Sequence, residues 1–351
     1  MNTTTLIPVS ILTGFLGAGK TTLLKRLLTE PQSQRWVIIE NEFGPINIDH
    51  ELLVESPNER IVEMSNGCLC CSIRGDLSDA LLDLAKKRAA GELDFDRVLI
   101  ETTGLAKPGP VIQTFFMDEA VVEHYLLDGV ITVVDAKHAM NTLDKQVEAQ
   151  QQVGVADRLL ISKTDLVSNQ ELDVLQQRLR RMNQRAKMTT VSFGEASLTD
   201  IFDLQGFHMS SDMDVYEPSQ ECGHDHDHSD CGHDHHHHEH IHDENCGHPH
   251  HAHDEVQSMG FESDKPFDPA RLEDFLAALL RLHGEELLRY KGVLYLKNVP
   301  QKVIFQGVHM LMASDLGRKW DKHEKKMSRV VFIGNPLPKQ AIEKGLKACV
   351  A

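Results

Sequence analysis

The apolar run Val9-Ser-Ile-Leu-Thr13 leads directly into Gly14-Phe-Leu-Gly17-Ala-Gly19-Lys20-Thr21, and this junction decides the fold. The run predicts a buried strand, and the residues from Thr21 to Leu28 predict a helix. A glycine-rich loop between a strand and a helix that opens with Lys-Thr matches the phosphate-binding pattern G-x-x-x-x-G-K-[ST]. The alternative, a chance glycine turn before a helix, leaves the shared register of strand, loop and helix unexplained.

Each part of this loop suits the binding of phosphate. Glycines allow backbone N–H groups to curl around an anion, and the helix N-terminus adds its positive end. Lys20 places a cation at the β- and γ-phosphates, and Thr21 offers a hydroxyl to Mg²⁺. We expect the nucleotide to contact Gly14, Gly17, Ala18, Gly19, Lys20, Thr21 and Thr22.

A second buried strand, Val98–Ile100, ends in Glu101-Thr-Thr-Gly104. At this place in a phosphate-loop domain, Glu101 is expected to hold Mg²⁺, directly or through water, and Gly104 to sense the γ-phosphate. The catalytic candidates are therefore Lys20, Thr21 and Glu101. The alternative is an ordinary surface glutamate after a strand.

Ser162-Lys163-Thr164-Asp165 follows the apolar strand Leu159–Ile161. A carboxylate at Asp165 accepts hydrogen bonds from both N1–H and the exocyclic amine of guanine, a pair that adenine cannot donate. Lys163 is placed to cover the base and brace the loop. The familiar guanine signature begins with Asn where this chain has Ser162, and a solvated loop charge pair is the alternative. GTP is the expected nucleotide.

Further strands are predicted at Trp36–Glu40 and Gly129–Val134, and a helix at Leu77–Ala90. Alternation of helices with almost continuously apolar strands predicts an α/β fold with a mostly parallel sheet flanked by helices. We assign residues 1–207 to this P-loop GTPase domain. From Met188 to Asp264 there is no Lys or Arg.

Residues 208–254 are expected to be a disordered, metal-binding linker, because their His, Asp, Glu, Gly and Cys residues cannot form an apolar core. Residues 255–351 are expected to be a smaller α+β domain. Asp268-Pro269 is a favourable helix start. The other elements predicted here are strands at Gly292–Leu296, Val303–Met312 and Val330–Ile333, and a helix from Pro338 to Leu346.

Three cysteines, Cys68, Cys70 and Cys71, lie within four residues. Thiolates are preferred ligands of zinc and Cu(I), and three of them leave a tetrahedral site one ligand short. Such an open site suits transfer of a metal better than its storage. Three buried structural cysteines are the alternative reading. The cluster lies between two segments, Glu40–Asp49 and Glu101–Gly104, whose counterparts in P-loop GTPases respond to the γ-phosphate.

The linker repeats the unit Cys-Gly-His three times, at Cys222, Cys231 and Cys246. Imidazole and thiolate suit Zn, Ni, Co and Cu, so a flexible tract of them offers many weak sites. A solvated low-complexity linker without a metal role is the alternative. The candidate ligands selected from the tract are His224, His226, His233 and His235.

The formal net charge of −17 opposes non-specific binding to nucleic acid or anionic lipid. No apolar run is long enough to cross a bilayer, and Met1–Leu6 lacks the basic start of a secretory signal. We therefore expect a cytoplasmic protein that binds neither membrane nor nucleic acid. The seven cysteines are not a secreted disulfide framework, and metal is the more usual role of such clusters in the cytosol.

Taken together, these residues resemble the CobW-type family of P-loop metallochaperone GTPases, which are related to UreG and HypB proteins. The residues that carry the resemblance are Thr13–Thr22, Glu40–Gly44, Asn66–Cys71, Glu101–Gly104, Ser162–Asp165, Leu287–Gly292 and Phe305–Gly307. The resemblance implies a GTPase domain and a CobW-type C-terminal domain.

The same resemblance implies that zinc binds at the Cys-x-Cys-Cys motif, with Cys68, Cys70 and Cys71 as ligands. It further implies Glu40 as an auxiliary metal-binding acid and Asp49 as a residue on the Mg²⁺ side, with Glu42 as another candidate ligand. Pro45 stands where close relatives often have an acid. Cobalt or nickel remain alternatives to zinc.

The resulting hypothesis is a Mg²⁺-dependent GTP hydrolase that transfers a metal, with zinc favoured, to a metal-dependent client protein. No water-positioning base or arginine finger stands out, so we expect slow intrinsic turnover; homo-oligomers are compatible with this reading. The alternative is a zinc buffer whose histidine-rich tract holds the metal while nucleotide regulates it. A metabolic P-loop kinase is a third reading, but it would require a small-molecule acceptor site for which there is no motif.

Overall fold

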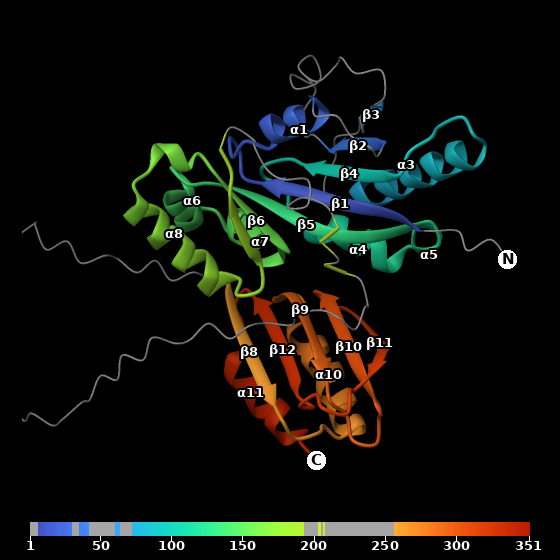
Figure 1. The fold of residues 1–351 in the computed structure, drawn as a ribbon, viewed down its shortest axis with the longest axis vertical. Coiled ribbons are helices and arrows are strands. Elements are labelled where there is room, and N and C mark those ends of the chain that lie inside the picture. The colour runs from blue at the N-terminus through green and yellow to red at the C-terminus, as the bar shows by residue number, and fades with distance from the viewer. Residues whose placement is uncertain are drawn as a thin grey trace, which may run out of the picture.

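The computed structural model describes residues 6–29, 35–41, 60–63, 72–192, 203–204, 206–207 and 256–351. Within these ranges the strands form two separate sheets, one of seven strands and one of five. In Figure 1 the five-stranded sheet, in orange and red, lies below the seven-stranded sheet, in blue and green.

The seven-stranded sheet has the order β3-β2-β4-β1-β5-β6-β7, and every pair of neighbours is parallel. Parallel strands all end at one edge of a sheet, so the loops that follow them gather along that edge. The predicted parallel sheet is confirmed. Its strands are β1 (Ile7–Gly14), β2 (Trp36–Asn41), β3 (Arg60–Glu63), β4 (Arg97–Thr102), β5 (Tyr125–Asp135), β6 (Arg158–Ser162) and β7 (Lys187–Thr190).

Helices cover both faces of this sheet. They are α1 (Lys20–Thr29), α3 (Ser72–Ala89), α4 (Gly109–Met117), α5 (Glu119–Val122), α6 (Ala139–Lys145), α7 (Val147–Val155), α8 (Asn169–Met182) and the 3₁₀ turn η1 (Thr164–Leu166). On one face, α1 packs through Leu23, Leu24 and Leu27. The helices α3, α4, α6, α7 and α8 contribute to the core on the other face. Helix α3 begins at Ser72, before the predicted start at Leu77. The prediction missed the first turn because the residues before Leu77 lack apolar periodicity.

The five-stranded sheet has the order β11-β10-β9-β12-β8, and its neighbours are antiparallel. Its elements are β8 (Gln257–Ser263), α10 (Pro269–His283), β9 (Leu287–Leu294), β10 (Gln301–Val308), β11 (Leu311–Lys319), β12 (Ser328–Gly334) and α11 (Lys339–Ala348). Both helices pack on one face of the sheet through Leu272, Leu276, Ile342 and Leu346. Helix α10 begins where predicted, and the Asp268 carboxylate caps it by accepting from the N–H of Arg271 at 3.1 Å.

One strand prediction in this region was wrong, and another had shifted bounds. Val303–Met312 is not one strand, because β10 and β11 form a hairpin in which Val308 pairs with Leu311. The turn includes His309, whose φ of 52° lies in the left-handed region, and no Gly, Pro, Asn or Asp marks it in the sequence. The strand predicted at Gly292–Leu296 is β9, which starts at Leu287 and is buried along its whole length.

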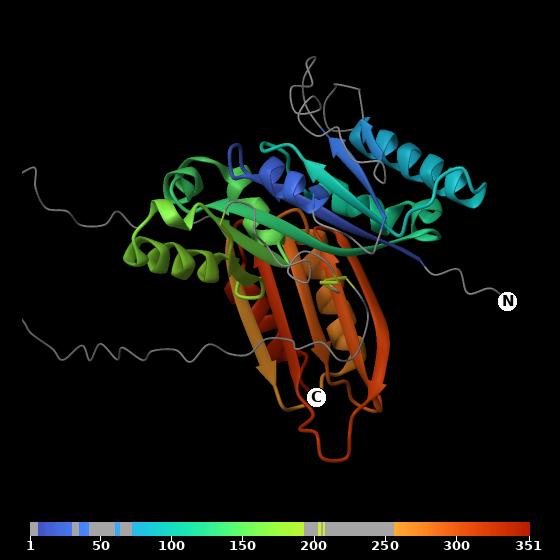
Figure 2. The same ribbon diagram turned by 45° about the horizontal axis from the view of Figure 1, so that its top comes forward.

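One end of the five-stranded sheet packs against the helix-covered underside of the seven-stranded sheet, as Figures 1 and 2 both show. Helix α7 contacts β9 and β12, and α8 contacts β8. Leu288, Val331 and Ile333 belong to the same apolar cluster as Val153 of α7. The apolar core is therefore continuous across the junction, and this limits independent movement of the two parts.

A buried ion pair crosses the same junction. Asp157 accepts from Arg289 at 2.8 Å and from Arg185 at 3.1 Å, and the side chains of Asp157 and Arg289 are both less than 5% exposed. The Arg289 guanidinium also lies 3.6 Å from the ring centroid of Phe207, and the Gly206 carbonyl accepts from Arg289 and Lys291. The predicted boundaries at 207/208 and 254/255 adjoin residues outside the described ranges and stay predictions.

Candidate nucleotide site

The loop after β1 has a backbone that only glycine adopts easily. Gly14, Gly17 and Gly19 have φ values of 143°, 73° and 102°. A Cβ on Gly14 would also lie 2.4 Å from the carbonyl oxygen of Val133. These conformations curl the loop around the start of α1, where the first N–H groups of the helix have no intrahelical partner. The result is a cradle with the chemistry of an anion site.

Lys20 lies at the base of this cradle. Its side chain is buried, and Nζ donates to the carbonyl oxygen of Gly14 at 2.9 Å. Thr21 and Thr22 follow it in the first turn of α1, half-buried and exposed respectively. Glycines, ammonium and helix N-terminus thus converge where phosphate is expected, and the residues present fit a nucleoside triphosphate.

The end of β4 lies beside the cradle. Glu101 pairs with Leu12 of β1, and the Thr102 hydroxyl donates to the Thr13 hydroxyl at 2.8 Å. A Cβ on Gly104 would lie only 2.5 Å from the backbone nitrogen of Leu16, so no larger residue fits there without displacing the P-loop. The hydroxyl of Thr21 and the carboxylate of Glu101 are hard oxygen donors of the kind Mg²⁺ prefers.

Glutamates occupy matching positions on three neighbouring strands. Glu40 of β2 pairs in register with Glu101 of β4 on one side and with Glu63 of β3 on the other. Sequence reasoning selected Glu40 and Glu101 but missed Glu63. The signal was present, because each of the three strands is an apolar run that ends in Glu.

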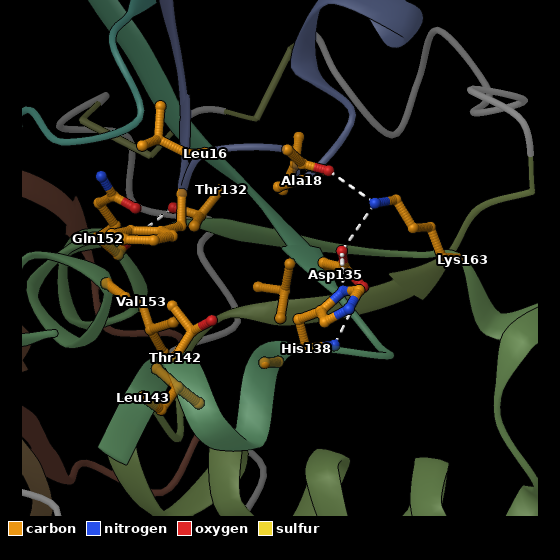
Figure 3. A pocket seen from close by; sticks show the side chains of 16 residues that line it. Leu16, Ala18, Thr132, Asp135, His138, Thr142, Leu143, Gln152, Val153 and Lys163 are labelled. Carbon is orange, nitrogen blue, oxygen red and sulfur yellow. Dashed lines mark hydrogen bonds and ion pairs between the residues drawn. The ribbon is translucent and has the colours of Figure 1, made fainter. Parts of the chain in front are cut away.

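Lys163 connects the loop after β6 to the P-loop. Its Nζ donates to the Gly17 carbonyl at 2.8 Å and to Asp135 Oδ2 at 2.7 Å. The backbone of Lys163 has a φ of 56°, which a lysine rarely adopts, so these two contacts hold a strained residue in place. Figure 3 shows Lys163 between the P-loop and Asp135, with His138 on the far side of the Asp135 carboxylate.

Sequence reasoning also missed Asp135, although an acid at the end of the buried strand β5 repeats the pattern that identified Glu101. Burial raises the pKa of the Asp135 carboxyl, but hydrogen bonds from Lys163 and His138 outweigh it, and the net pKa is lowered. Asp135 is therefore a stable anion that keeps Lys163 beside the P-loop.

Two further residues of this segment, Ser162 and Asp165, have different surroundings: Ser162 is buried against the P-loop, and Asp165 is exposed. Ser162, which replaces the usual Asn, donates from its hydroxyl to the Ala18 carbonyl at 2.7 Å and so joins β6 to the P-loop. Asp165 lies in η1 and is exposed. Its carboxylate is thus accessible to a ligand at the P-loop edge of the sheet.

Comparison with known proteins decides which of the P-loop families this site belongs to. Residues 8–190 match the family model for the CobW/HypB/UreG nucleotide-binding domain, and residues 256–350 match the model for the cobalamin synthesis protein cobW C-terminal domain. The chain belongs to the CobW family.

Individual relatives match along almost the whole of this CobW-family chain. The protein named zinc chaperone YjiA from Escherichia coli is 39% identical over 336 residues, 96% of each chain. The zinc chaperone CobW of Pseudomonas aeruginosa is 31% identical over 100% of this chain and 93% of its own. The crystal structure of Zn(II)-bound YjiA GTPase from E. coli superimposes with a TM-score of 0.78 at 35% identity, covering 99% of both chains.

A cavity of about 280 Å³ lies behind the P-loop of this CobW-family domain. Figure 3 shows its lining, which comes from the P-loop, the end of β5 and helices α6 and α7. Apolar side chains such as Leu16, Leu143 and Val153 dominate the interior, and Gln152 forms part of the wall. The cavity therefore borders the P-loop on the side of β5, α6 and α7.

Most of the metal ligands predicted for this CobW-family protein lie outside the described residues. Only the backbone of Glu40 is described, and within the described ranges no three His, Cys, Asp or Glu side chains gather as a metal site. In the same ranges, no helix is both long and apolar enough to cross a bilayer. The predicted site residues beyond the described ranges are Glu42, Asp49, Cys68, Cys70, Cys71, His224, His226, His233 and His235.

Proposed function

We propose that this chain is a GTPase that couples its nucleotide state to the binding and release of zinc. The names of its relatives, zinc chaperones and a Zn(II)-bound GTPase, support the metal and the reaction. The cytoplasm is the compartment we propose, and a metal-dependent client protein is the proposed recipient.

In this proposal the phosphates of GTP lie in the cradle formed by the P-loop glycines and the start of α1. Lys20 exchanges its contact with Gly14 for the β- and γ-phosphate oxygens and neutralises their charge. The exposed Asp165 accepts the two guanine donors, while Lys163 holds its loop against the P-loop. The preference for guanine over adenine follows from Asp165, and the triphosphate preference from Lys20 and the loop at Gly104.

Hydrolysis needs a water oxygen to attack the γ-phosphorus while the bond to the β–γ bridging oxygen breaks, which gives GDP and phosphate. Thr21, Glu101 and Asp49 are the residues that would hold Mg²⁺, which when bound supplies positive charge to the β- and γ-phosphate oxygens. In this proposal the Gly104 loop, which packs directly on Leu16 of the P-loop, contacts the γ-phosphate and so distinguishes GTP from GDP.

Zinc is the cargo of the protein in this proposal. The thiolates of Cys68, Cys70 and Cys71 bind it, with Glu40 as the fourth ligand. Three thiolates and one carboxylate make a site whose weakest ligand is easily replaced, and a client thiolate or imidazole is the replacement.

One observation carries the coupling between the two sites. Glu40 and Glu101 occupy paired positions on adjacent parallel strands, so their backbones lie about 4.8 Å apart. The proposed zinc-side acid and the proposed Mg²⁺-side acid are thus direct neighbours in the sheet. If the end of β4 shifts when the γ-phosphate binds, the hydrogen-bonded end of β2 moves with it, because the two strands are paired there.

The test is a competitive Zn²⁺ titration of the full chain, run without nucleotide, with GDP and with a non-hydrolysable GTP analogue. We expect Zn²⁺ affinity to differ between the GDP and analogue states by about tenfold or more. Replacing Cys68, Cys70 and Cys71 by Ser should abolish this nucleotide-dependent binding. Cys349→Ser is the matched control, because Cys349 is a buried thiol in the C-terminal domain.

Deletion of residues 222–253 separates the chaperone from the buffer. If metal-coupled GTP hydrolysis survives the deletion, the transfer function stands. Loss of all tight Zn²⁺ binding in the deleted chain, with the cysteine variant unaffected, would instead establish storage in the histidine-rich tract. Equal Zn²⁺ affinity in all three nucleotide states would refute the coupling.

A further inference from the structure

Helix α7 carries two buried glutamines, Gln150 and Gln152, which are only 5% and 1% exposed. Burial of an amide is costly unless its hydrogen-bonding groups find partners, so buried glutamines are normally held by specific contacts. The two side chains contact different parts of the molecule. The contacts of Gln152 are on the P-loop side, and one contact of Gln150 is on the C-terminal domain.

Gln152 holds the loop that follows β4. Its Nε2 donates to the carbonyl oxygens of Gly104 and Ala106, both at 3.0 Å. The two amide hydrogens are therefore both used, and no other described side chain bridges these two carbonyls. The loop is itself a tight turn, closed by the N–H of Ala106 on the carbonyl of Thr103 at 3.1 Å. Gln152 thus fixes the orientation of two peptide groups in this loop, the one between Gly104 and Leu105 and the one between Ala106 and Lys107.

The same residue is anchored from behind. The Thr132 hydroxyl of β5 donates to the backbone carbonyl of Gln152 at 2.7 Å. The side chain also borders the cavity under the P-loop, next to Leu16. Because Gly104 packs directly on Leu16, a movement of the P-loop or of the Gly104 loop changes the distance that Gln152 must span.

Gln150 makes the corresponding contact with the C-terminal domain. Its Oε1 accepts from the N–H of Val256 at 3.1 Å, and its Nε2 donates to the Leu143 carbonyl at 2.8 Å. Val256 is buried and directly precedes β8. Further along α7, Gly154 packs so closely on Leu288 and Val256 that a Cβ there would lie 2.7 Å and 3.1 Å from them.

We propose that Gln152 is a positioning residue for GTP hydrolysis, and that α7 transmits the position of the Gly104 loop to the C-terminal domain. A helix of this length behaves as a rigid rod, so displacement at Gln152 reaches Gln150 and Gly154. The inference rests on the proposed function, in which Gly104 senses the γ-phosphate. It adds Gln152 as the residue that holds the Gly104 loop, and α7 as the element that connects this loop to the C-terminal domain.

The first test compares Gln152→Met with Gln150→Met in the full chain. Methionine keeps the length and burial of glutamine but cannot donate or accept in the same way. In Gln152→Met we expect kcat for GTP to fall about tenfold. Because turnover is slow, KM approximates the dissociation constant of GTP and should rise by about the same factor as GMPPNP affinity falls. Its affinity for the non-hydrolysable analogue GMPPNP should fall relative to GDP. Gln150→Met, which also replaces a buried, doubly hydrogen-bonded glutamine of α7, should keep the wild-type GMPPNP/GDP ratio.

Two results would overturn the positioning role of Gln152. One is an unchanged kcat with an unchanged GMPPNP/GDP affinity ratio in Gln152→Met. The other is an equal loss of kcat and an equal change of this ratio in Gln152→Met and Gln150→Met. Gly104→Ala serves as the reference that displaces the loop itself. If it changes the GMPPNP/GDP ratio and Gln152→Met does not, only this inference fails. If wild type and Gly104→Ala both bind GMPPNP and GDP alike, the proposed function fails.

Amide hydrogen exchange of the wild-type chain tests the transmission without any substitution. We expect exchange at Val256–Ser258 to differ between the GDP and GMPPNP states, and the difference to vanish in both glutamine variants. Identical exchange in the two states of the wild type would exclude α7 as the route.

Discussion

Lys163 donates a hydrogen bond from Nζ to the carbonyl oxygen of Gly17 across 2.8 Å, and so joins the loop after β6 to the P-loop. The same ammonium lies 2.7 Å from Oδ2 of Asp135. One side chain therefore braces the loop after β6 against both the P-loop and the end of β5. The strained backbone of Lys163 is the conformational cost of this link.

Loss of this link should weaken nucleotide binding. We predict that Lys163→Met lowers affinity for both GDP and GTP by about tenfold, because a charge-assisted hydrogen bond contributes about 1.5–3 kcal/mol. Titration calorimetry measures the effect. Lys137→Met, which removes an exposed cation two residues from Asp135, is the control and should bind normally. Equal affinity in Lys163→Met and Lys137→Met would contradict the bracing role.

Asp165 should determine the choice of base. We predict that Asp165→Asn lowers the preference for GTP over ATP by at least about tenfold, since the amide cannot accept both guanine donors. Affinity for xanthosine triphosphate should rise, because xanthine presents a carbonyl to the new amide. Competition binding with the three triphosphates checks both effects. A variant that still prefers GTP as strongly as wild type would place base recognition elsewhere.

The ion pair between the two domains should be important for stability. Asp157→Asn keeps the acceptor for the Val130 N–H but leaves the buried Arg289 without its anion. We predict a loss of about 3–5 kcal/mol in the free energy of unfolding, measured by urea denaturation. Asp83→Asn removes the partner of Lys87 on the solvent-facing side of α3, and should cost less than about 1 kcal/mol. Similar losses in the two variants would show that burial of the pair has no consequence.

Lys291 should make stability depend on pH. Burial, and secondarily the nearby Arg185 and Arg289, lower the pKa of Lys291 to about 6, whereas an unfolded lysine has a pKa of about 10.4. Between these two values the unfolded chain holds a proton that the folded chain lacks, so the free energy of unfolding rises with pH. The slope from this group approaches about 1.4 kcal/mol per pH unit.

We therefore predict that Lys291→Met is more stable than wild type at pH 7, and that this advantage shrinks as the pH rises toward 9. Urea denaturation at pH 7, 8 and 9 measures the difference. Lys319→Met, on exposed β11, should show no such trend. A difference between wild type and Lys291→Met that stays constant with pH would mean that Lys291 remains charged in the folded protein.

The sequence was most informative where a local pattern has a single physical solution. The glycines from Gly14 to Gly19 need left-handed backbone, and the structure gives them positive φ values. The cap at Asp268 and the buried parallel strands were read correctly for the same reason. The hairpin at His309 was not, because nothing local distinguishes an apolar residue before a turn from one within a strand.

The sequence by itself determined the glycine-rich loop between a strand and a helix, and the parallel sheet flanked by helices around it, because these follow from backbone preferences and apolar periodicity over a few residues. Only the tertiary structure decided that Glu63 aligns with Glu40, that Asp135 restrains Lys163, and that Gln152 spans from α7 to Gly104. These contacts join residues far apart in the chain, where register and packing, rather than local preference, fix which side chains meet.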